Sequence, residues 1–320
     1  MEVRTFGSTN LRVSALGLGA AEIGFQNAPD QTVDALLSVA LDSGLNVIDT
    51  AECYMDSEEK LGRVLGARRQ RCLLFTKCGH APRPRPASLL VRAVRKASRP
   101  MARLVGRALP DWNPRLLEQN IERSLRRLRT DWLDLVQLHS CSEEILRRGE
   151  VIEVLQRARQ AGKTRYIGYS GDGPAAFYAV ESGQFDSLQT SVNIADQQAL
   201  DLTLPLARER GMGVIAKRPI ANALWKSVER PEQSSNHAYW ERLQELRYDF
   251  LKDREQALQI ALRFTLSVPG VHTAIVGTIR AEHCSKNAEF AAAGVLDRSQ
   301  IEAICARWKA IARPDWVGQD

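Results

Sequence analysis

Four polar residues able to donate, accept or steady a proton lie in the first half of the chain. Asp49, Lys77 and His139 each end a short apolar run, and Tyr54 follows Asp49 by five residues in the string DTAECYMDSEEKLG. A phenol, with an ordinary pKa of about 10, donates a proton at neutral pH only where a nearby cation stabilises the phenolate it leaves. This set of side chains therefore predicts proton donation to an oxygen that gains negative charge.

Each of the four residues has a distinct place in that chemistry. Lys77 supplies the cation beside Tyr54, and Asp49 holds the charge and position of Lys77, because a lysine in a dry site otherwise tends to lose its proton. His139 can hydrogen-bond a substrate oxygen and orient it for transfer. Taken one at a time, these residues also fit a turn cap, a half-buried aromatic or a core histidine. Together the four residues fit the roles of a single catalytic site.

The elements that must position these side chains alternate regularly along the chain. Short runs rich in Val, Ile and Leu alternate with amphipathic stretches, a pattern typical of βα units and a parallel sheet. The expected strands are residues 15–20, 46–50, 72–77, 133–139, 165–170, 187–192, 213–216 and 273–276. The expected helices are residues 31–43, 58–65, 114–128, 145–160, 202–210 and 256–267, and Gly44, Gly162 and Gly211 follow three of them as expected caps.

Eight βα units without a leftover strand predict a (β/α)8 barrel rather than an open doubly wound sheet. The open sheet stays as the alternative, although GLGAAEIG is too loosely spaced for a dinucleotide-binding glycine motif. We expect a single domain over residues 1–320, with a hairpin around residues 7–10 that plugs the bottom of the barrel. Three segments lie outside the repeat: a basic helical insertion at 79–112, a long polar loop at 221–252 and a C-terminal helix and tail at 295–320.

The formal charge of +6 is concentrated in one segment. Residues 81–110 hold eight basic side chains and no acidic ones, and without them 36 basic residues face 38 acidic ones. The segment lacks the aromatic residues that stack on single-stranded bases, so we expect no nucleic acid partner. A solvated helical hairpin and contact with an anionic surface or partner through 79–112 both remain open.

Targeting and cysteine patterns predict a cytoplasmic protein. The N-terminal residues lack a basic stretch followed by an apolar one, and no later stretch has 18 uninterrupted apolar residues, so we expect no stable membrane insertion. The six cysteines are scattered without CxxC pairs, which fits neither a disulfide framework nor a zinc site. We expect reduced thiols and no metal.

These motifs together resemble those of the aldo-keto reductase family along nearly the whole chain, apart from the basic insertion. The family pattern DxxxxYxxSExxLG, followed by a strand-end Lys and His, is matched by Asp49, Tyr54, Ser57, Glu58, Leu61, Gly62, Lys77 and His139. The strings NPRLLEQNIERSLRRLRTDWLDLVQLH and GKTRYIGYS are similar to further segments of the family. The resemblance implies NADP(H) as cofactor and reduction of a small carbonyl compound, an aldehyde or a ketone, with Tyr54 as general acid.

The resemblance also implies a cofactor-binding set along the second half of the barrel. Ser170 and Gln189 would bind the nicotinamide carboxamide, with Asn193 as a neighbouring site residue. The string VGTIRAEHCSKN resembles the family's adenosine-phosphate segment and places these residues at the adenine end: Gly277, Thr278, Arg280, His283 and Asn287. An arginine beside a hydroxyl and a helix N-terminus suits a 2′-phosphate, which favours NADPH over NADH.

The chain departs from the family at several cofactor positions. Lys217 stands where an aromatic residue usually stacks on the nicotinamide, and its charge would repel the oxidised ring unless it turned away. Two alternatives remain open: the methylene stem of Lys217 packs on the nicotinamide ring, or Trp225 takes the place of the missing aromatic residue. Arg218 would bind the pyrophosphate. Gly171 replaces a common asparagine. Val192 replaces the tyrosine of QxxYN, and Met55 the glycine after the catalytic tyrosine.

Two other functions remain as alternatives to an NADP-dependent oxidoreductase. A cofactor-binding regulatory barrel with little turnover is compatible with the departures at Lys217 and Gly171. A redox sensor is the other, because Cys53 and Cys78 lie beside Tyr54 and Lys77 and a nearby cation favours a thiolate.

Overall fold

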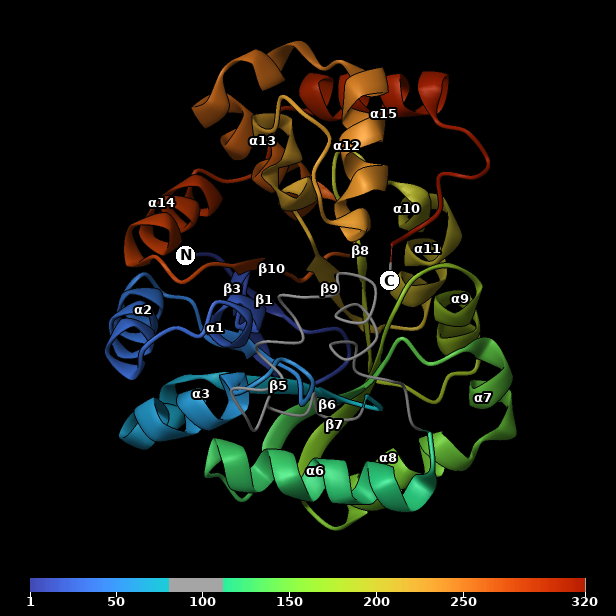
Figure 1. Ribbon diagram of the computed structural model, residues 1–320. Helices are drawn as coiled ribbons and strands as arrows, with labels where there is room; N and C mark the ends of the chain where they lie inside the picture. The colour runs from blue at the N-terminus through green and yellow to red at the C-terminus, as the bar shows by residue number, and fades with distance from the viewer. Residues whose placement is uncertain (81–111, 320) are drawn as a thin grey trace, which may run out of the picture.

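The computed structural model describes residues 1–80 and 112–319. Eight parallel strands close into a barrel in the order β10-β3-β4-β5-β6-β7-β8-β9, and Figure 1 shows the helices arranged around them. The barrel strands are β3 (Leu16–Gly19), β4 (Val47–Asp49), β5 (Leu73–Cys78), β6 (Leu133–His139), β7 (Thr164–Ser170), β8 (Ser187–Ser191), β9 (Gly213–Lys217) and β10 (Thr273–Gly277). All eight predicted strands are confirmed, so the fold is the predicted (β/α)8 barrel.

Helices cover the outside of the barrel. They include α1 (Ala21–Phe25), α2 (Asp30–Asp42), α3 (Ser57–Leu65), α6 (Pro114–Leu128), α9 (Gly173–Glu181), α13 (Arg254–Ser267) and α14 (Ala281–Ala292), with the short helix η1 (Gly66–Arg71) before β5. Of these, α2, α3, α6 and α13 were predicted, whereas α1, α9 and α14 were not. The sequence explains their ends: the Asn113 side chain accepts a hydrogen bond from the backbone of Arg115, and Pro114 opens α6, where its missing N–H costs nothing. Gly44, Gly162 and Gly211 all have positive φ, which confirms the predicted caps.

Two predicted helices are each divided in the structure. The stretch predicted as one helix over 145–160 forms α7 (Glu143–Arg148) and α8 (Glu150–Gln160), because Gly149 adopts φ +81° between them. The stretch predicted over 202–210 forms α10 (Gln198–Leu202) and α11 (Leu204–Glu209). Pro205, in the first turn of α11, lacks the N–H that would continue the preceding helix.

A short hairpin closes the bottom of the barrel, as predicted. Strands β1 (Val3–Thr5) and β2 (Arg12–Ser14) pair antiparallel on either side of the turn. Three apolar side chains of the hairpin segment are buried against residues from four barrel strands; the cluster comprises Phe6, Leu11, Val13, Val47, Phe75, Leu135 and Ile215. This packing fills the end of the barrel opposite to His139.

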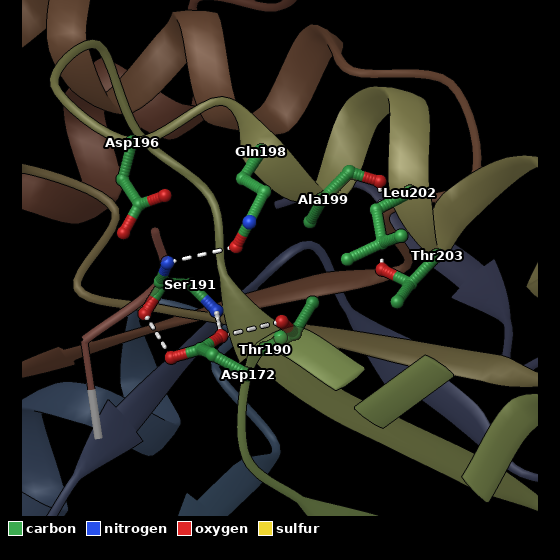
Figure 2. Close-up of a pocket in the computed structure, with 10 residues that line it drawn as sticks. Asp172, Thr190, Ser191, Asp196, Gln198, Ala199, Leu202 and Thr203 are labelled. Atoms are coloured by element: carbon green, nitrogen blue, oxygen red, sulfur yellow. Dashed lines mark hydrogen bonds between the residues drawn. The ribbon is translucent and has the colours of Figure 1, made fainter. Parts of the chain in front are cut away.

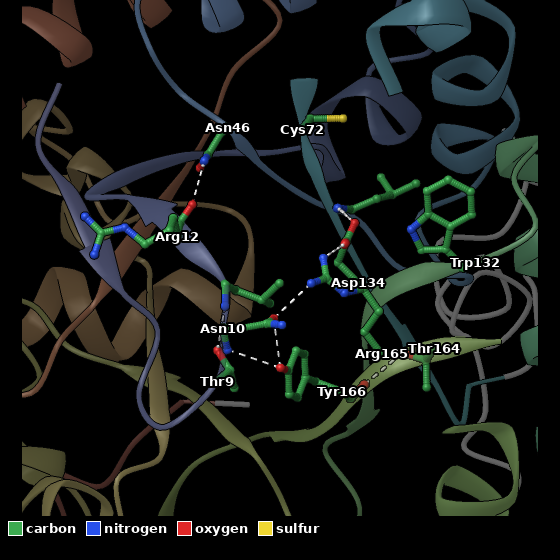
Figure 3. A network of polar contacts seen from close by, with 12 residues as sticks. Thr9, Asn10, Arg12, Asn46, Cys72, Trp132, Asp134, Thr164, Arg165 and Tyr166 are labelled. Atoms are coloured by element: carbon green, nitrogen blue, oxygen red, sulfur yellow. Dashed lines mark hydrogen bonds and ion pairs between the residues drawn. The ribbon is translucent and has the colours of Figure 1, made fainter. Parts of the chain in front are cut away.

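Polar contacts lock the hairpin to the neighbouring strands (Figure 3). Tyr166 donates to Asn10 at 2.9 Å, and Arg165 bridges from Asn10 to the buried carboxylate of Asp134, with 2.9 and 3.0 Å contacts. Both oxygens of Asp134 are used, since Oδ2 also accepts from the backbone of Leu74 and pairs with Arg69. This end of the barrel is therefore built for stability.

The segment 221–252, predicted as a long polar loop, contains a helix. It comprises η2 (Ala221–Lys226), η3 (Ser234–Asn236), α12 (His237–Leu246) and η4 (Asp249–Lys252). Helix α12 buries Tyr239, Leu243 and Leu246, whose helical spacing is obscured in the sequence by polar neighbours. The predicted C-terminal helix is α15 (Arg298–Ile311), and the tail after it returns to α12, where Arg242 donates to the carbonyl of Val317 at 2.6 Å.

Residues 81–111 of the predicted basic insertion lie outside the described residues, so its helical character stays a prediction. Its first and last residues are described: Gly79 and His80 follow β5, and Trp112 precedes α6. All six cysteines are free, as predicted.

Candidate active site

The four predicted catalytic side chains converge at one end of strands β4, β5 and β6. Asp49 is the last residue of β4, Lys77 the penultimate residue of β5 and His139 the last residue of β6. Tyr54 lies in the short connection between β4 and α3. Because the carboxyl ends of parallel barrel strands face the same way, three separate stretches of sequence are brought together there.

Lys77 is almost completely buried and is held by two acceptors. Its Nζ lies 2.5 Å from Asp49 Oδ1 and 2.9 Å from the carbonyl oxygen of Thr50, and 5.1 Å from the centre of the Tyr54 ring. Burial opposes a charge on Lys77, but the carboxylate of Asp49 and the Tyr54 phenol outweigh it and raise the pKa of the ammonium. The site therefore keeps a fixed cation against the tyrosine.

Two opposed effects act on the pKa of Tyr54: burial raises it, and the charge of Lys77 acts to lower it. Burial outweighs the charge of Lys77, so the pKa of the phenol lies above its ordinary value. The ring is set edge-on to Phe25 at 5.6 Å and to His139 at 5.9 Å between ring centroids. Met55, next in the chain, has φ +56°, a left-handed conformation that a glycine adopts without strain. Met55 therefore adopts a backbone conformation that would suit a glycine at this position.

His139 is a neutral ring in this site. Burial, with the charges of Lys77 and His80, lowers its pKa well below the usual histidine range. The ring of His80 lies 4.8 Å away, and His80 Nε2 donates to the carbonyl oxygen of His139 at 2.8 Å. A neutral imidazole can donate one hydrogen bond to a substrate oxygen without adding a second positive charge.

Glu52 and His80 belong to this site, although neither was predicted. Glu52 Oε1 accepts from the backbone N–H groups of Gly79 at 2.8 Å and His80 at 3.0 Å and from the Asn120 amide at 2.9 Å. Burial, with the nearby charge of Glu58, raises the pKa of Glu52 to about 8. Glu52 thus ties the turn after β4 to the turn after β5. Its place inside the string DTAECY was the available sequence signal.

Ser170 and Gln189, predicted to bind the nicotinamide, form a row with His139 across three strands. His139 pairs with Ser170 in the β6–β7 ladder, and Ser170 with Gln189 in the β7–β8 ladder. Both predicted residues are buried, and Gln189 Oε1 accepts from Gln137 at 2.8 Å. The carboxyl ends of the strands form the mouth of the barrel. In this half of the mouth, the row places hydroxyl and amide groups at the same height along the strands.

Asn193, the predicted neighbour of that pair, is fully buried just beyond β8. Its Oδ1 accepts from the backbone of Ala195 at 2.8 Å, and its backbone bridges to Asp196. The residue shapes the turn that follows the strand.

Lys217 is held by a carboxylate that the sequence did not single out. Its ammonium lies 3.0 Å from Oδ2 of Asp172. That oxygen also accepts from Ser191 Oγ at 2.9 Å, while Oδ1 of Asp172 accepts from Thr190 Oγ1 at 2.6 Å and from the Ser191 backbone N–H at 2.7 Å (Figure 2). Arg218 donates to Ser191 Oγ at 3.1 Å and to the carbonyl of Gln319. The pair with Asp172 neutralises the charge of Lys217.

The glycine at 171 has a steric reason in this chain. A Cβ atom on Gly171 would lie 2.5 Å from the hydroxyl of Tyr169, which donates to the carbonyl of Cys141 at 2.8 Å. No side chain fits there unless Tyr169 moves. The Tyr169 ring therefore occupies the space that a side chain at position 171 would need.

Strained backbone marks the loop after β9. Arg218, Ala221, Asn222 and Ala223 all have φ between +44° and +55°. Such conformations cost non-glycine residues about 1–2 kcal/mol each and cluster where a ligand is gripped. Trp225, in the same loop, is half-buried and packs against the core.

The residues predicted for the adenine end gather where β10 passes into α14. Gly277 ends β10, Thr278 Oγ1 accepts from the backbone of Arg280 at 3.1 Å, and Arg280 and His283 are exposed at the start of the helix. Asn287, one turn further, is buried. An exposed guanidinium, an exposed imidazole, a hydroxyl and a helix N-terminus form a donor set that suits a phosphate.

Residues 15–309 match the Aldo/keto reductase family. A solved structure of an aldo-keto reductase from Bacillus halodurans in its holo form superposes with a TM-score of 0.78 at 26% identity, covering 99% of both chains. L-galactose dehydrogenase from Arabidopsis thaliana is 26% identical, over 100% of this chain and 99% of that protein. NADH-specific methylglyoxal reductase from Escherichia coli is 27% identical, over 68% of this chain and 67% of that protein.

Within residues 1–80 and 112–319, none of the helices combines the length and the apolar character needed to cross a membrane.

Proposed function

Because the chain belongs to the aldo-keto reductase family, whose members are oxidoreductases that use nicotinamide cofactors, we propose that it reduces an aldehyde or ketone with NADPH and that Tyr54 donates the proton. The observation that carries the proposal is the buried Lys77 ammonium, paired with Asp49 at 2.5 Å and 5.1 Å from the Tyr54 ring. A cation in this place lowers the free energy of the phenolate formed when Tyr54 gives up its proton.

The cofactor supplies the hydride that adds to the carbonyl carbon. As negative charge develops on the carbonyl oxygen, the Tyr54 hydroxyl transfers its proton to that oxygen. Asp49 keeps Lys77 charged and in place, so the resulting phenolate meets a fixed positive charge rather than one that must reorganise. His139, neutral at physiological pH, donates a hydrogen bond to the same oxygen and fixes its direction.

The second half of the barrel mouth would hold the cofactor. Ser170 and Gln189 present a hydroxyl and an amide for the carboxamide, and Arg218 presents a guanidinium for the pyrophosphate. Lys217 turns its charge to Asp172, which leaves its methylene stem for the nicotinamide face. At the far end, Arg280 at the start of α14 suits the 2′-phosphate that distinguishes NADPH from NADH.

We infer a single domain over residues 1–320 and a cytoplasmic, small-molecule oxidoreductase. Contact of residues 79–112 with an anionic surface or partner stays a prediction. The matched relatives named above are all oxidoreductases, and no observation favours a regulatory or redox-sensing barrel.

Cofactor titration tests the NADPH preference. We expect NADPH to bind more tightly than NADH, and Arg280→Met to weaken NADPH binding about tenfold while leaving NADH unchanged. Lys286→Met, an exposed cation on the same helix that pairs with Glu255, is the matched control. Equal affinity for both cofactors in the unaltered protein would refute the preference. One relative named above is specific for NADH by its name, so the opposite preference occurs in this family.

Single-turnover oxidation of bound NADPH tests the reaction. The panel includes simple aldehydes, ketones, methylglyoxal and aldoses, because two relatives are named for sugar and methylglyoxal chemistry. Substrate-dependent loss of NADPH fluorescence supports the proposal. Tight binding without oxidation across the whole panel would count against it.

A further inference from the structure

The ring of His139 is held by a contact that involves neither Lys77 nor the substrate. Its Nδ1 lies 3.5 Å from the sulfur of Cys53, the residue immediately before Tyr54. Cys53 is 7% exposed. On the other side, His80 binds the backbone carbonyl of His139, a contact that fixes the chain but leaves both ring nitrogens untouched. Cys53 is therefore the only described residue that hydrogen-bonds the imidazole itself.

The direction of that hydrogen bond decides which ring nitrogen carries the proton. A neutral imidazole has one N–H, and its other nitrogen is an acceptor. If Nδ1 carries the proton, it faces sulfur, a weak acceptor, and Nε2 has only a lone pair to offer a carbonyl oxygen, which is also an acceptor. If Cys53 S–H donates to Nδ1, Nε2 carries the proton and can donate to that oxygen.

The second arrangement is the favoured one on chemical grounds. A thiol is more acidic than a neutral imidazole N–H, and imidazole nitrogen accepts better than thioether or thiol sulfur. We propose that Cys53 is a positioning residue that donates its S–H to Nδ1 of His139 and so holds the imidazole proton on Nε2 for the substrate oxygen. The proposal rests on the proposed reduction, in which His139 orients that oxygen.

The surrounding contacts keep Cys53 in place for this purpose. Glu52, one residue earlier, is fixed by the backbone of Gly79 and His80, and Tyr54, one residue later, lies edge-on to His139 at 5.9 Å. Three consecutive side chains thus join the turn after β4 to the turn after β5, set the histidine tautomer and supply the acid. A shift of this short segment would disturb all three together.

Nitrogen NMR of the histidine rings tests the tautomer directly. The chain has five histidines, so ¹⁵N-histidine labelling with His139→Asn for assignment gives one resolvable ring. We expect a protonated Nε2 and an unprotonated Nδ1 in the unaltered protein and in Cys53→Ser, whose hydroxyl also donates. Cys53→Ala should show a mixture of both tautomers. A protonated Nδ1 in the unaltered protein, or an unchanged spectrum in Cys53→Ala, would overturn the proposal.

Kinetics give a second, separate measure. We expect Cys53→Ala to lower the single-turnover rate about three- to tenfold, the size of one ordinary hydrogen bond, with recovery in Cys53→Ser. Cys72→Ala removes another buried thiol, just before β5 at the opposite end of the barrel, and should change neither the rate nor the His139 spectrum. If the protein reduces no carbonyl, the NMR result still decides the role of Cys53, so failure of the reductase proposal is distinguishable from failure of this one.

Discussion

Two buried carboxylates at opposite ends of the barrel pair with cations in different ways. Asp134, near the start of β6, uses both oxygens: Oδ1 binds Arg165, and Oδ2 binds Arg69 and the backbone of Leu74. Asp49, at the end of β4, binds Lys77 through Oδ1, and its buried Oδ2 has no hydrogen-bond partner among the described residues. Both oxygens of Asp134 have hydrogen-bond or ion-pair partners, whereas one oxygen of Asp49 has none among the described residues.

This difference separates structural ion pairs from catalytic ones within one fold. The base of the barrel joins its hairpin and strands through groups that contact only one another (Figure 3). The mouth places a buried cation against an aromatic hydroxyl and leaves hydrogen-bonding capacity unused. Buried polar groups without partners are costly, and the unpartnered oxygen of Asp49 belongs to the carboxylate that pairs with the cation beside Tyr54.

Removing the cation at the mouth should give the largest effect. We expect Lys77→Met to lower the rate of carbonyl reduction about 10²- to 10⁴-fold, because Tyr54 loses the charge that stabilises its phenolate. It should also destabilise the fold by about 3–5 kcal/mol, since Asp49 is left buried without its partner. The measurements are single-turnover kinetics and urea unfolding. Arg63→Met, which breaks an exposed pair with Asp30, should leave both the urea-unfolding curve and the rate nearly unchanged.

Breaking the pair at the base should separate stability from activity. We expect Asp134→Asn to reduce the free energy of unfolding by about 3 kcal/mol, because Arg69 and Arg165 lose a shared carboxylate. The turnover rate of the folded fraction should stay within about twofold of the unaltered protein. A large loss of rate in folded Asp134→Asn would show that the two ends are coupled, against the comparison drawn above.

A smaller change is expected at the cofactor half of the mouth. Despite burial, the charge of Lys217 and the hydrogen bonds from Thr190 and Ser191 hold the pKa of Asp172 below its usual value. Such a group stabilises the fold above the ordinary aspartate pKa and loses that contribution as the pH falls. We expect Asp172→Asn to cost about 1–3 kcal/mol near neutral pH. The gap to the unaltered protein should narrow as the pH falls below about 4, as followed by urea unfolding.

The same substitution should disturb cofactor binding. Lys217 would then lack its neutralising partner and repel the oxidised ring, so the Kd for NADP⁺ should rise relative to that for NADPH. An unchanged ratio of the two Kd values would mean that Lys217 lies too far from the nicotinamide to matter.

The last expected effect is a change in how the stability of the fold varies with pH. Because burial raises the pKa of Glu52 from its ordinary 4.5 to about 8, the folded protein holds this proton more tightly than the unfolded chain does. The resulting stability is complete at low pH and declines as the pH rises through about 8. As the pH rises from about 5 to about 8, the free energy of unfolding should therefore fall less in Glu52→Gln than in the unaltered protein. Parallel urea-unfolding curves for the two proteins would contradict this, and Glu181→Gln, an exposed carboxylate on α9, is the control.

The sequence was most informative where structure depends on local pattern. Strands β3 to β10 follow from apolar runs, and the ends of β4, β5 and β6 bring Asp49, Lys77 and His139 together once the barrel is inferred. Tyr54 follows because the connection from Asp49 is short. These residues needed only strand ends and a closed parallel sheet to be placed.

The other contacts depend on pairings between distant segments. Asp172 pairs with Lys217 across β8, and the tail residue Gly318 donates its N–H to Gln198 far earlier in the chain. Asp172 and Gln198 come close together in the fold (Figure 2). Neither pairing has a local pattern. Helix α12 was missed for a related reason, because its buried residues contact the core at only three helical positions among polar neighbours. The contact of Cys53 with His139 likewise appears only once β4 and β6 are placed.

Single-turnover reduction by Tyr54→Phe tests the central claim most directly. Phenylalanine keeps the ring against Phe25 and His139 and removes only the hydroxyl, so NADPH affinity should stay within about threefold of the unaltered protein. The rate of hydride transfer to a substrate from the panel should fall about 10²- to 10⁴-fold. A variant that binds NADPH and reduces the same substrate within about threefold of the original rate would contradict the assignment of Tyr54 as the proton donor.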